Sequence, residues 1–299
     1  MFLLDQKLVP RDYDKWIKML SNNEARPLIR QFYPDPLENI EVDGFGTDPL
    51  EEESFQTASE NGFIHKYPTK LLILISEECL IRCRYCTRKR IVFNKSTKFT
   101  EDKIKQTVEY IKNHTQIQEL IFSGGDPFYL SVDQLLGYLS FFVSLEQIKK
   151  IRFHTRAITI SPQIFSETNI LALSSLIARN RNIKFTIVLH VNHPTELRPE
   201  SLSVIRNLKK IGFNTLSQSV LLRDVNDSSE VLLQLFLKLS AAGVQPYYLH
   251  QLDRVQGAAH FEVPVSEGIK FMKEVRKKLV RCLIPAYVTD SKTGKKPLL

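Results

Sequence analysis

Hydrophobic residues gather in short continuous runs from about residue 70 onward. Runs typical of buried strands occupy 71–76, 118–122, 150–153, 184–189, 216–222 and 244–249. Helical spacing of apolar residues lies between them at 101–113, 133–142, 200–210, 228–241 and 266–280. The later strands recur about every 30 residues, which is the length of a βα repeat. Repeated βα units with buried strands indicate a parallel sheet, either open or rolled into a barrel.

The number of repeats decides between these two forms. Six or so units fit into the chain, fewer than the eight of a closed barrel. The sequence therefore predicts an α/β fold in which residues 61–299 form a partial (βα)6 TIM-like barrel. Residues 1–60 predict an N-terminal helical extension, in which Trp16, Met19 and Leu20 share one helix face. The acidic run at 51–53 is expected to be exposed.

Composition places the chain among ordinary globular proteins. It has 299 residues, of which 43% are hydrophobic and 25% charged. No segment approaches the ~18 consecutive apolar residues of a membrane span, and the N-terminus lacks the pattern of a secretory signal. We therefore expect a cytoplasmic protein with no membrane partner. A net charge of +8 would suit nucleic acid, but the lysines are spread along the chain, so nucleic acid is not an expected partner.

Three cysteines fall within eight residues, directly after the first apolar run. Cys79, Cys83 and Cys86 have the spacing C-x3-C-x2-C. Clustered thiolates bind zinc or iron–sulfur, and structural zinc usually takes four ligands. Three cysteines suit a [4Fe-4S] cluster with one open iron. A zinc site completed by His65 or Cys282 is the alternative, although the apolar neighbours of Cys282 predict a buried free thiol.

A glycine-rich turn follows the second apolar run. Gly124 and Gly125 permit close approach of the backbone to a ligand, and Asp126 offers a carboxylate to an ammonium group. A simple tight turn is the alternative interpretation.

The cysteine spacing resembles the signature of the radical S-adenosylmethionine enzymes. The resemblance implies that Cys79, Cys83 and Cys86 hold a [4Fe-4S] cluster whose open iron binds S-adenosylmethionine. It also implies that the glycine-rich turn at 124–126 holds the methionine amino group. An electron donor such as flavodoxin or ferredoxin is then an expected partner. The usual fold of that superfamily is also a partial barrel.

Further motifs make the resemblance more specific. The segments that resemble the lysine 2,3-aminomutase family are 65–68, 86–88, 124–127, 155–156, 190–196, 218–227 and 246–249. The resemblance implies an isomerase that moves the amino group of L-lysine to the adjacent carbon, giving β-lysine, with pyridoxal 5′-phosphate as a further cofactor. The short C-terminus and residues 252–261 resemble the elongation factor P (R)-β-lysylation branch, while Asp290 is shared with the free-lysine enzymes.

Pyridoxal phosphate needs a lysine for its Schiff base and donors for its phosphate. The resemblance implies Lys295 as the Schiff-base lysine, with the adjacent Lys296 as the alternative and a solvated tail as the plain interpretation of both. It implies Lys66, Tyr67 and Lys70 at the phosphate. Relatives carry arginines at the first and third of these positions, so the bidentate fork is lost here.

The same resemblance implies how a lysine substrate would be bound. Arg88 would grip its carboxylate in two parallel hydrogen bonds. Asp253 and Asp290 would bind its side-chain ammonium, which would neutralise two carboxylates at one buried site. Two other functions remain as alternatives: a radical enzyme that modifies RNA, and a zinc-stabilised binding module without catalysis. The sequence leaves the oligomeric state open.

Overall fold

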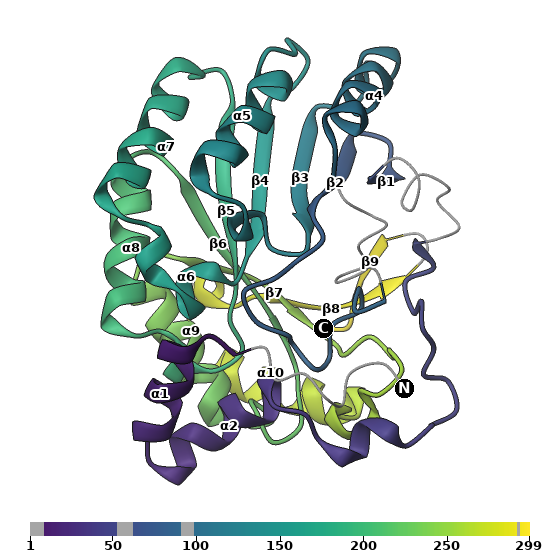
Figure 1. Ribbon diagram of the computed structural model, residues 1–299. Coiled ribbons are helices and arrows are strands. Elements are labelled where there is room, and N and C mark those ends of the chain that lie inside the picture. The colour runs from purple at the N-terminus through teal and green to yellow at the C-terminus, as the bar shows by residue number, and fades with distance from the viewer. Residues whose placement is uncertain (1–8, 53–61, 91–98, 292–293) are drawn as a thin grey trace.

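The computed structural model describes residues 9–52, 62–90, 99–291 and 294–299 (Figure 1). Within these ranges one sheet of nine strands runs in chain order from β1 to β9, and it curls into a nearly closed barrel. The strands are β1 (Phe63–Tyr67), β2 (Lys70–Ser76), β3 (Glu119–Gly124), β4 (Lys150–Thr155), β5 (Lys184–His190), β6 (Asn214–Val220), β7 (Gln245–His250), β8 (Ala286–Ser291) and β9 (Gly294–Pro297). Strands β2 to β8 are parallel, and β1 and β9 add antiparallel edges.

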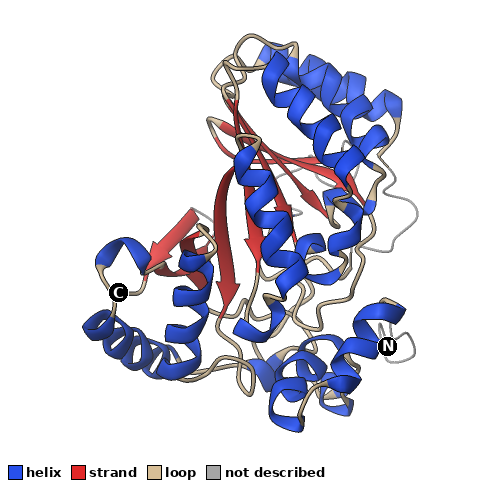
Figure 2. Ribbon diagram, turned by 90° about the vertical axis from the view of Figure 1, so that its left-hand side faces the viewer, coloured by secondary structure: helices blue, strands red, loops and turns tan. Residues whose placement is uncertain are grey.

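Helices follow the parallel strands and cover the outside of the sheet (Figure 2). The longer ones are α4 (Glu101–Asn113), α5 (Val132–Val143), α7 (Glu167–Arg179), α8 (Pro199–Lys210), α9 (Ser229–Ala241) and α10 (Val265–Lys278), with the short α6 (Ala157–Ile160) after β4. In the described ranges, six βα units thus precede the last parallel strand, β8. This confirms the predicted partial (βα)6 barrel. The sequence pattern missed α7, β1, β8 and β9.

Side chains along a strand point alternately to the apolar core and to the interior of the barrel. In β4, Ile151 and Phe153 are fully buried in the apolar core with the helices, whereas Arg152 and His154 line a cavity inside the barrel. Because successive side chains of a strand point to opposite faces, a strand can serve both environments at once. The barrel interior is therefore free to carry polar groups near the carboxyl ends of the strands.

The N-terminal helices α1 (Arg11–Met19) and α2 (Asn22–Phe32) pack beside the barrel (Figure 1). Their buried cluster includes Ile17 and Phe32, and it also contains Ile81 from the cysteine segment. The predicted apolar face of the first helix was wrong in one respect, because Met19 is 80% exposed. The predicted boundary at 60/61 lies outside the described residues and stays a prediction.

Cys282 corrects another expectation. It lies in the 3-10 turn η8 (Arg281–Leu283) between α10 and β8, and it is exposed rather than buried. Its apolar neighbours suggested a core segment, but the connection 279–285 between the helix and the strand runs over the surface at this residue. None of the helices within the described ranges combines the length and the apolar character that crossing a bilayer requires.

Candidate functional site

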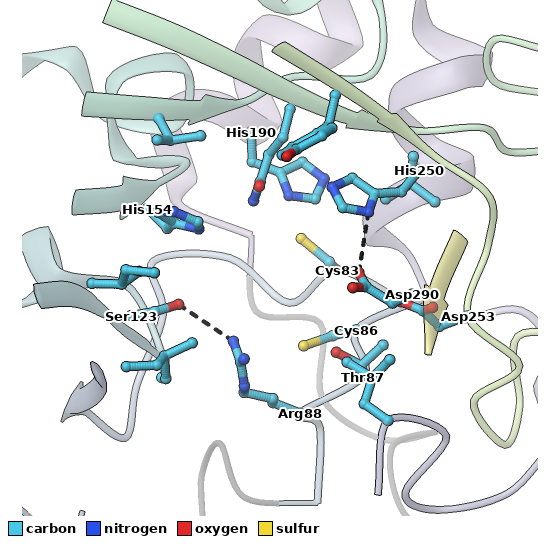
Figure 3. Close-up of a pocket in the computed structure, with 18 of the residues that line it drawn as sticks. Cys83, Cys86, Thr87, Arg88, Ser123, His154, His190, His250, Asp253 and Asp290 are labelled. Carbon is cyan, nitrogen blue, oxygen red and sulfur yellow. Dashed lines mark hydrogen bonds and ion pairs between the residues drawn. The ribbon is translucent and has the colours of Figure 1, made fainter. Parts of the chain in front are cut away.

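A cavity of about 550 Å³ opens where the parallel strands end. Its position is the one at which barrel folds gather functional groups from several strands. Every residue that the sequence singled out as a site residue lines it, namely Lys66, Tyr67, Lys70, Cys79, Cys83, Cys86, Arg88, Gly124, Gly125, Asp126, Asp253, Asp290 and Lys295. Figure 3 shows part of this lining, with Cys83 and Cys86 near the centre and Asp253 and Asp290 beside them on the right.

The two glycines of the turn after β3 let it lie directly against the cysteine loop. A Cβ added at Gly125 would stand 2.1 Å from the Glu78 carbonyl oxygen, and Gly124 has a φ of +101°. The Gly125 amide donates to the Ser76 carbonyl at 2.6 Å. Only glycine fits such an approach without moving backbone. The turn therefore fixes the start of the cysteine loop.

Asp126 faces the cavity, but the chain's own donors surround its carboxylate. The Thr155 hydroxyl donates to both oxygens at 2.7 and 2.9 Å, and the amides of Arg156, Ala157 and Phe128 donate at 2.7, 3.1 and 3.0 Å. Burial raises the pKa of this carboxyl. A carboxylate with four protein donors organises its own loop, and the expected role of Asp126 toward a ligand ammonium stays a prediction.

A buried arginine supports the cysteine loop from the far side. Arg156 donates to Glu196 at 2.6 Å, to the Tyr85 hydroxyl at 2.5 Å and to the Cys83 sulfur at 3.2 Å. It also donates to Gln31 of α2 at 2.8 Å. The motifs at 155–156 and 190–196 thus meet beneath the cysteines, in one hydrogen-bonded network.

Burial, and then the charge of Cys83, raise the pKa of Cys86 to about 11, and burial raises the pKa of Cys79 well above its usual value. These cysteines therefore favour the neutral thiol unless a positively charged metal centre binds them. Neither proposed fourth zinc ligand is among the residues that line the cavity with the cysteines: His65 bonds Tyr110 at 2.8 Å, and Cys282 is exposed. Three thiols on one loop beside open cavity space suit a cluster with one free iron. Among the described residues, no group of three or more His, Cys, Asp or Glu side chains could hold a single metal ion.

The β8–β9 hairpin carries the candidate Schiff-base lysine. Asp290 lies opposite Lys295 in the register, and the Lys295 ammonium contacts the Asp290 carboxylate at 2.6 Å. Lys296 lies opposite Thr289 and is not among the cavity residues, because alternate residues of β9 point to opposite faces. Burial acts to raise the pKa of Asp290, but hydrogen bonds from His250 and Lys295 hold it well below its usual range.

Cationic side chains lie on the neighbouring wall. Lys66 donates to the Ser291 carbonyl at 2.5 Å, and Lys70 is 3.6 Å from Glu119. Arg152 forms an ion pair with the same glutamate and lines the cavity. Arg152 was not among the predicted site residues, although its alternate position on the third predicted strand was an available signal.

Arg88 does not present a free guanidinium to the cavity. Its Nε and Nη2 donate to the two carboxylate oxygens of Glu52 at 3.0 and 2.7 Å, and Nη1 reaches the Ser123 hydroxyl at 3.3 Å (Figure 3). Burial acts to lower the pKa of Arg88, but the charge and hydrogen bonds of Glu52 outweigh burial, and the pKa is raised. Glu52 is only 6% exposed, so the expectation of an exposed acidic run was wrong at this position. Residue 53 lies outside the described ranges.

Asp253 is a partly buried carboxyl of the cavity. Burial, and then the nearby charge of Asp290, raise its pKa to about 7, although Lys295 acts in the opposite direction. A carboxyl of this kind is poised to ionise when a cation arrives beside it.

Three histidines complete the upper wall at the ends of β4, β5 and β7. Burial lowers the pKa of His154, His190 and His250, so these imidazoles are neutral near pH 7 (Figure 3). His190 was predicted only as part of a loop motif, and His154 and His250 were not predicted as site residues. Their position at the end of each strand run was the available signal.

Comparison with known proteins places this geometry in context. The model of the radical SAM superfamily matches residues 73–236, more than half of the chain. The protein named L-lysine 2,3-aminomutase in Escherichia coli (strain K12) is 35% identical over 282 residues, which cover 94% of this chain and 79% of that protein. The protein of the same name in Clostridium subterminale is 30% identical over 273 residues, covering 91% and 64%.

A solved structure shares the fold. A radical SAM methyltransferase from Sphaerobacter thermophilus superposes with a TM-score of 0.53 at 15% identity, covering 76% of this chain and 68% of that one. At this identity the likeness concerns the fold alone.

Proposed function

Because the chain belongs to the lysine 2,3-aminomutase family of the radical SAM superfamily, we propose that it converts L-lysine to β-lysine with the help of pyridoxal phosphate. The observation that carries the proposal is a single cavity lined both by the three cysteines and by Lys295. A radical source and an amine that can hold pyridoxal phosphate would then face the same substrate. The alternatives of an RNA-modifying enzyme and of a non-catalytic zinc module have no comparable support in the cavity.

The cofactors would divide the chemistry with the protein. When bound, the cluster and S-adenosylmethionine supply a carbon radical, and pyridoxal phosphate supplies the group on which nitrogen migrates. Cys79, Cys83 and Cys86 would hold the cluster, and Arg156 would keep the Cys83 sulfur in place through its 3.2 Å contact. The protein's own contribution is position and the exclusion of water.

The hairpin wall fits pyridoxal phosphate. Lys295 provides the amine, and Lys66, Lys70 and Arg152 provide positive charge for a phosphate. Gly294 has a φ of +123°, which favours glycine, and a Cβ there would lie 3.1 Å from the Tyr67 ring, so glycine lets the hairpin lie close against Tyr67. A flat ring bound beside Lys295 would lie near Tyr248, whose ring centre is 5.3 Å from the Lys295 nitrogen.

Charged groups at two places in the cavity suit the two ends of the substrate. Arg88 offers a fork for the carboxylate. Asp253 lies near enough to Asp290 for the charge of Asp290 to raise the pKa of Asp253. Such a pair of carboxyls is suited to bind a cation. The side-chain ammonium of L-lysine is a cation of the right kind, and two ends fixed in this way would orient the carbons that react.

A finer proposal concerns the use of the product. Residues 252–261 resemble the elongation factor P branch, and their buried members Leu252, Val255 and Phe261 pack with Tyr85 of the cysteine loop. We propose that the β-lysine serves to modify elongation factor P. Mass spectrometry of elongation factor P from cells lacking this gene tests it, and an unchanged mass would remove this part of the proposal.

Turnover of L-lysine is the direct test of the main proposal. Protein reconstituted anaerobically with iron, sulfide, pyridoxal phosphate and S-adenosylmethionine is reduced and incubated with labelled L-lysine. NMR should show β-lysine in the mixture. Unchanged lysine, from protein that holds its full iron complement, would count against the proposal.

Borohydride trapping should identify the amine that holds pyridoxal phosphate. We expect reduction to fix the cofactor at Lys295, because this side chain lies in the cavity and Lys296 does not. Peptide mass mapping locates the label. Lys295→Ala should abolish labelling, and the matched variant Lys296→Ala should keep it. Label at Lys296, or retained labelling in Lys295→Ala, would contradict the assignment.

Affinity for L-lysine should rise with pH because of Asp253. With a pKa of about 7, this carboxyl is largely protonated at pH 6 and ionised at pH 8. If only the ionised form attracts the ammonium, the dissociation constant should fall about tenfold across this range. Calorimetry on pyridoxal-phosphate-loaded protein measures it, with L-norleucine, which lacks the ammonium, as the control. In Asp253→Asn, the dissociation constants of L-lysine and L-norleucine should change with pH in the same way. If the pH dependence still differed between the two ligands as in the wild type, the role of Asp253 would be refuted.

A further inference from the structure

Arg88 is bound to a carboxylate of the protein's own chain, that of Glu52. Glu52 occupies the fork of Arg88 through two hydrogen bonds of 3.0 and 2.7 Å. Both residues line the cavity, and Glu52 is 6% exposed. An α-carboxylate held by the same fork would require the same two donor positions, so both carboxylates cannot bind there together.

Glu52 is held at this place by the segment that precedes it. We call residues 35–52 the strap. Its Gly46 pairs with Val255 in an isolated parallel bridge, next to the loop that carries Asp253. The Asp48 carboxylate accepts from the Glu52 amide at 3.1 Å and pairs with Arg90 at 2.8 Å. The strap therefore joins the cysteine side of the cavity to the aspartate side and presents Glu52 between them.

The other charged end of the cavity is filled in the same way. The Lys295 ammonium contacts Asp290 at 2.6 Å, where the substrate ammonium is proposed to bind. A carboxylate and an ammonium of the chain thus stand at the two places that suit a carboxylate and an ammonium of the substrate. Arg88 and Asp290 are partly buried, and a charge in such a place is costly without a partner, which gives this self-occupancy a physical reason.

We propose that Glu52 is an internal competitor for the substrate carboxylate and that it sets the affinity of the site for amino acids. The inference rests on the proposed function, since it takes Arg88 as the carboxylate-binding residue. Glu52 must leave the fork before the substrate carboxylate enters it. The observed affinity is then the intrinsic affinity reduced by the small fraction of molecules in which the fork is free.

The substitution Glu52→Gln should therefore tighten binding of L-lysine. Glutamine keeps the size of the side chain, so the strap can keep its path, but it gives up the charge that holds the fork. We expect the dissociation constant for L-lysine to fall about tenfold. Calorimetry on pyridoxal-phosphate-loaded protein without S-adenosylmethionine measures it. Binding of 1,5-diaminopentane, which is lysine without its carboxylate, should not change.

The matched control is Glu38→Gln in the same strap. Glu38 binds buried Arg84 with the same two-point geometry, at 2.7 and 2.6 Å, but neither residue lines the cavity. This variant should bind L-lysine as the wild type does. Equal tightening in Glu38→Gln would overturn the proposal, because a loosened strap would then explain the effect.

The remaining outcomes separate the inference from the function on which it rests. If the wild-type protein binds L-lysine as tightly as Glu52→Gln, or more tightly, the inference about Glu52 is overturned and the proposed function is not. Binding only in Glu52→Gln supports it in its strongest form. If neither protein binds L-lysine, the proposed function and the inference both fail. Glu52→Ala provides a second variant in which the carboxylate is removed altogether, and it should tighten binding in the same direction.

Discussion

Replacing Cys86 with alanine should remove the iron–sulfur cluster and reduce turnover of L-lysine to the background of the assay. The side chain lines the cavity beside Cys79 and Cys83, and a cluster that rests on three thiolates loses a third of its protein ligands. Iron and sulfide analysis after anaerobic reconstitution, together with the visible absorption of the cluster, measures the loss. We expect about four iron atoms per chain in the wild type and few in the variant.

Cys282→Ala is the control for this experiment. Cys282 is the other cysteine of the sequence and is exposed, so its removal should leave iron content and turnover unchanged. Iron retained in Cys86→Ala, or lost in Cys282→Ala, would contradict the three-cysteine site.

Replacing Arg156 with methionine should destabilise the fold by about 3–5 kcal/mol, the usual cost of breaking a buried ion pair from one side. The Arg156 side chain is 7% exposed and Glu196 is fully buried, and the pair is 2.6 Å apart. Without the guanidinium, the Glu196 carboxylate remains buried with only uncharged donors, including the Asn192 and His193 amides at 2.9 and 3.0 Å. Chemical denaturation of the cofactor-free protein measures the change in free energy of unfolding.

The control is Arg254→Met, which breaks an exposed pair with Glu262. These side chains are 59% and 31% exposed, and such pairs contribute about 0–1 kcal/mol. Similar losses in the two variants would show that the Arg156 network is not the support described above. A second readout is hydrogen exchange in α2, which should rise only in Arg156→Met, because Arg156 bonds Gln31 and its guanidinium lies 4.7 Å from the Phe32 ring centre.

The barrel could be predicted because strands such as β2 and β5 are buried over most of their length. Such strands appear in the sequence as continuous apolar runs, and the helices between them show their own period. The edge strands carry no such signal. Strand β9 is Gly-Lys-Lys-Pro, and its residues 295–297 are exposed, so pairing with β8 and not hydrophobic burial places it in the sheet.

Some features of the candidate site could be predicted from the sequence and others could not. The cysteine loop and the two glycines were recognisable because ligand chemistry and close backbone approach demand particular residue types at fixed local spacing. Other features depend on distant segments meeting. Pairing of β8 with β9 turns Lys295 into the cavity and leaves Lys296 outside it.

By itself, therefore, the sequence determined the succession of βα units and the residue types that gather where the strands end. Only the tertiary structure decided which charges meet there. Glu52 appeared to belong to a solvated acidic run, yet it is buried against Arg88, 36 residues away. Arg156 meets Cys83 and Glu196 across separations of 73 and 40 residues. Such pairs leave no periodic trace, because the free energy of an ion pair depends on distance and burial in space rather than on spacing along the chain.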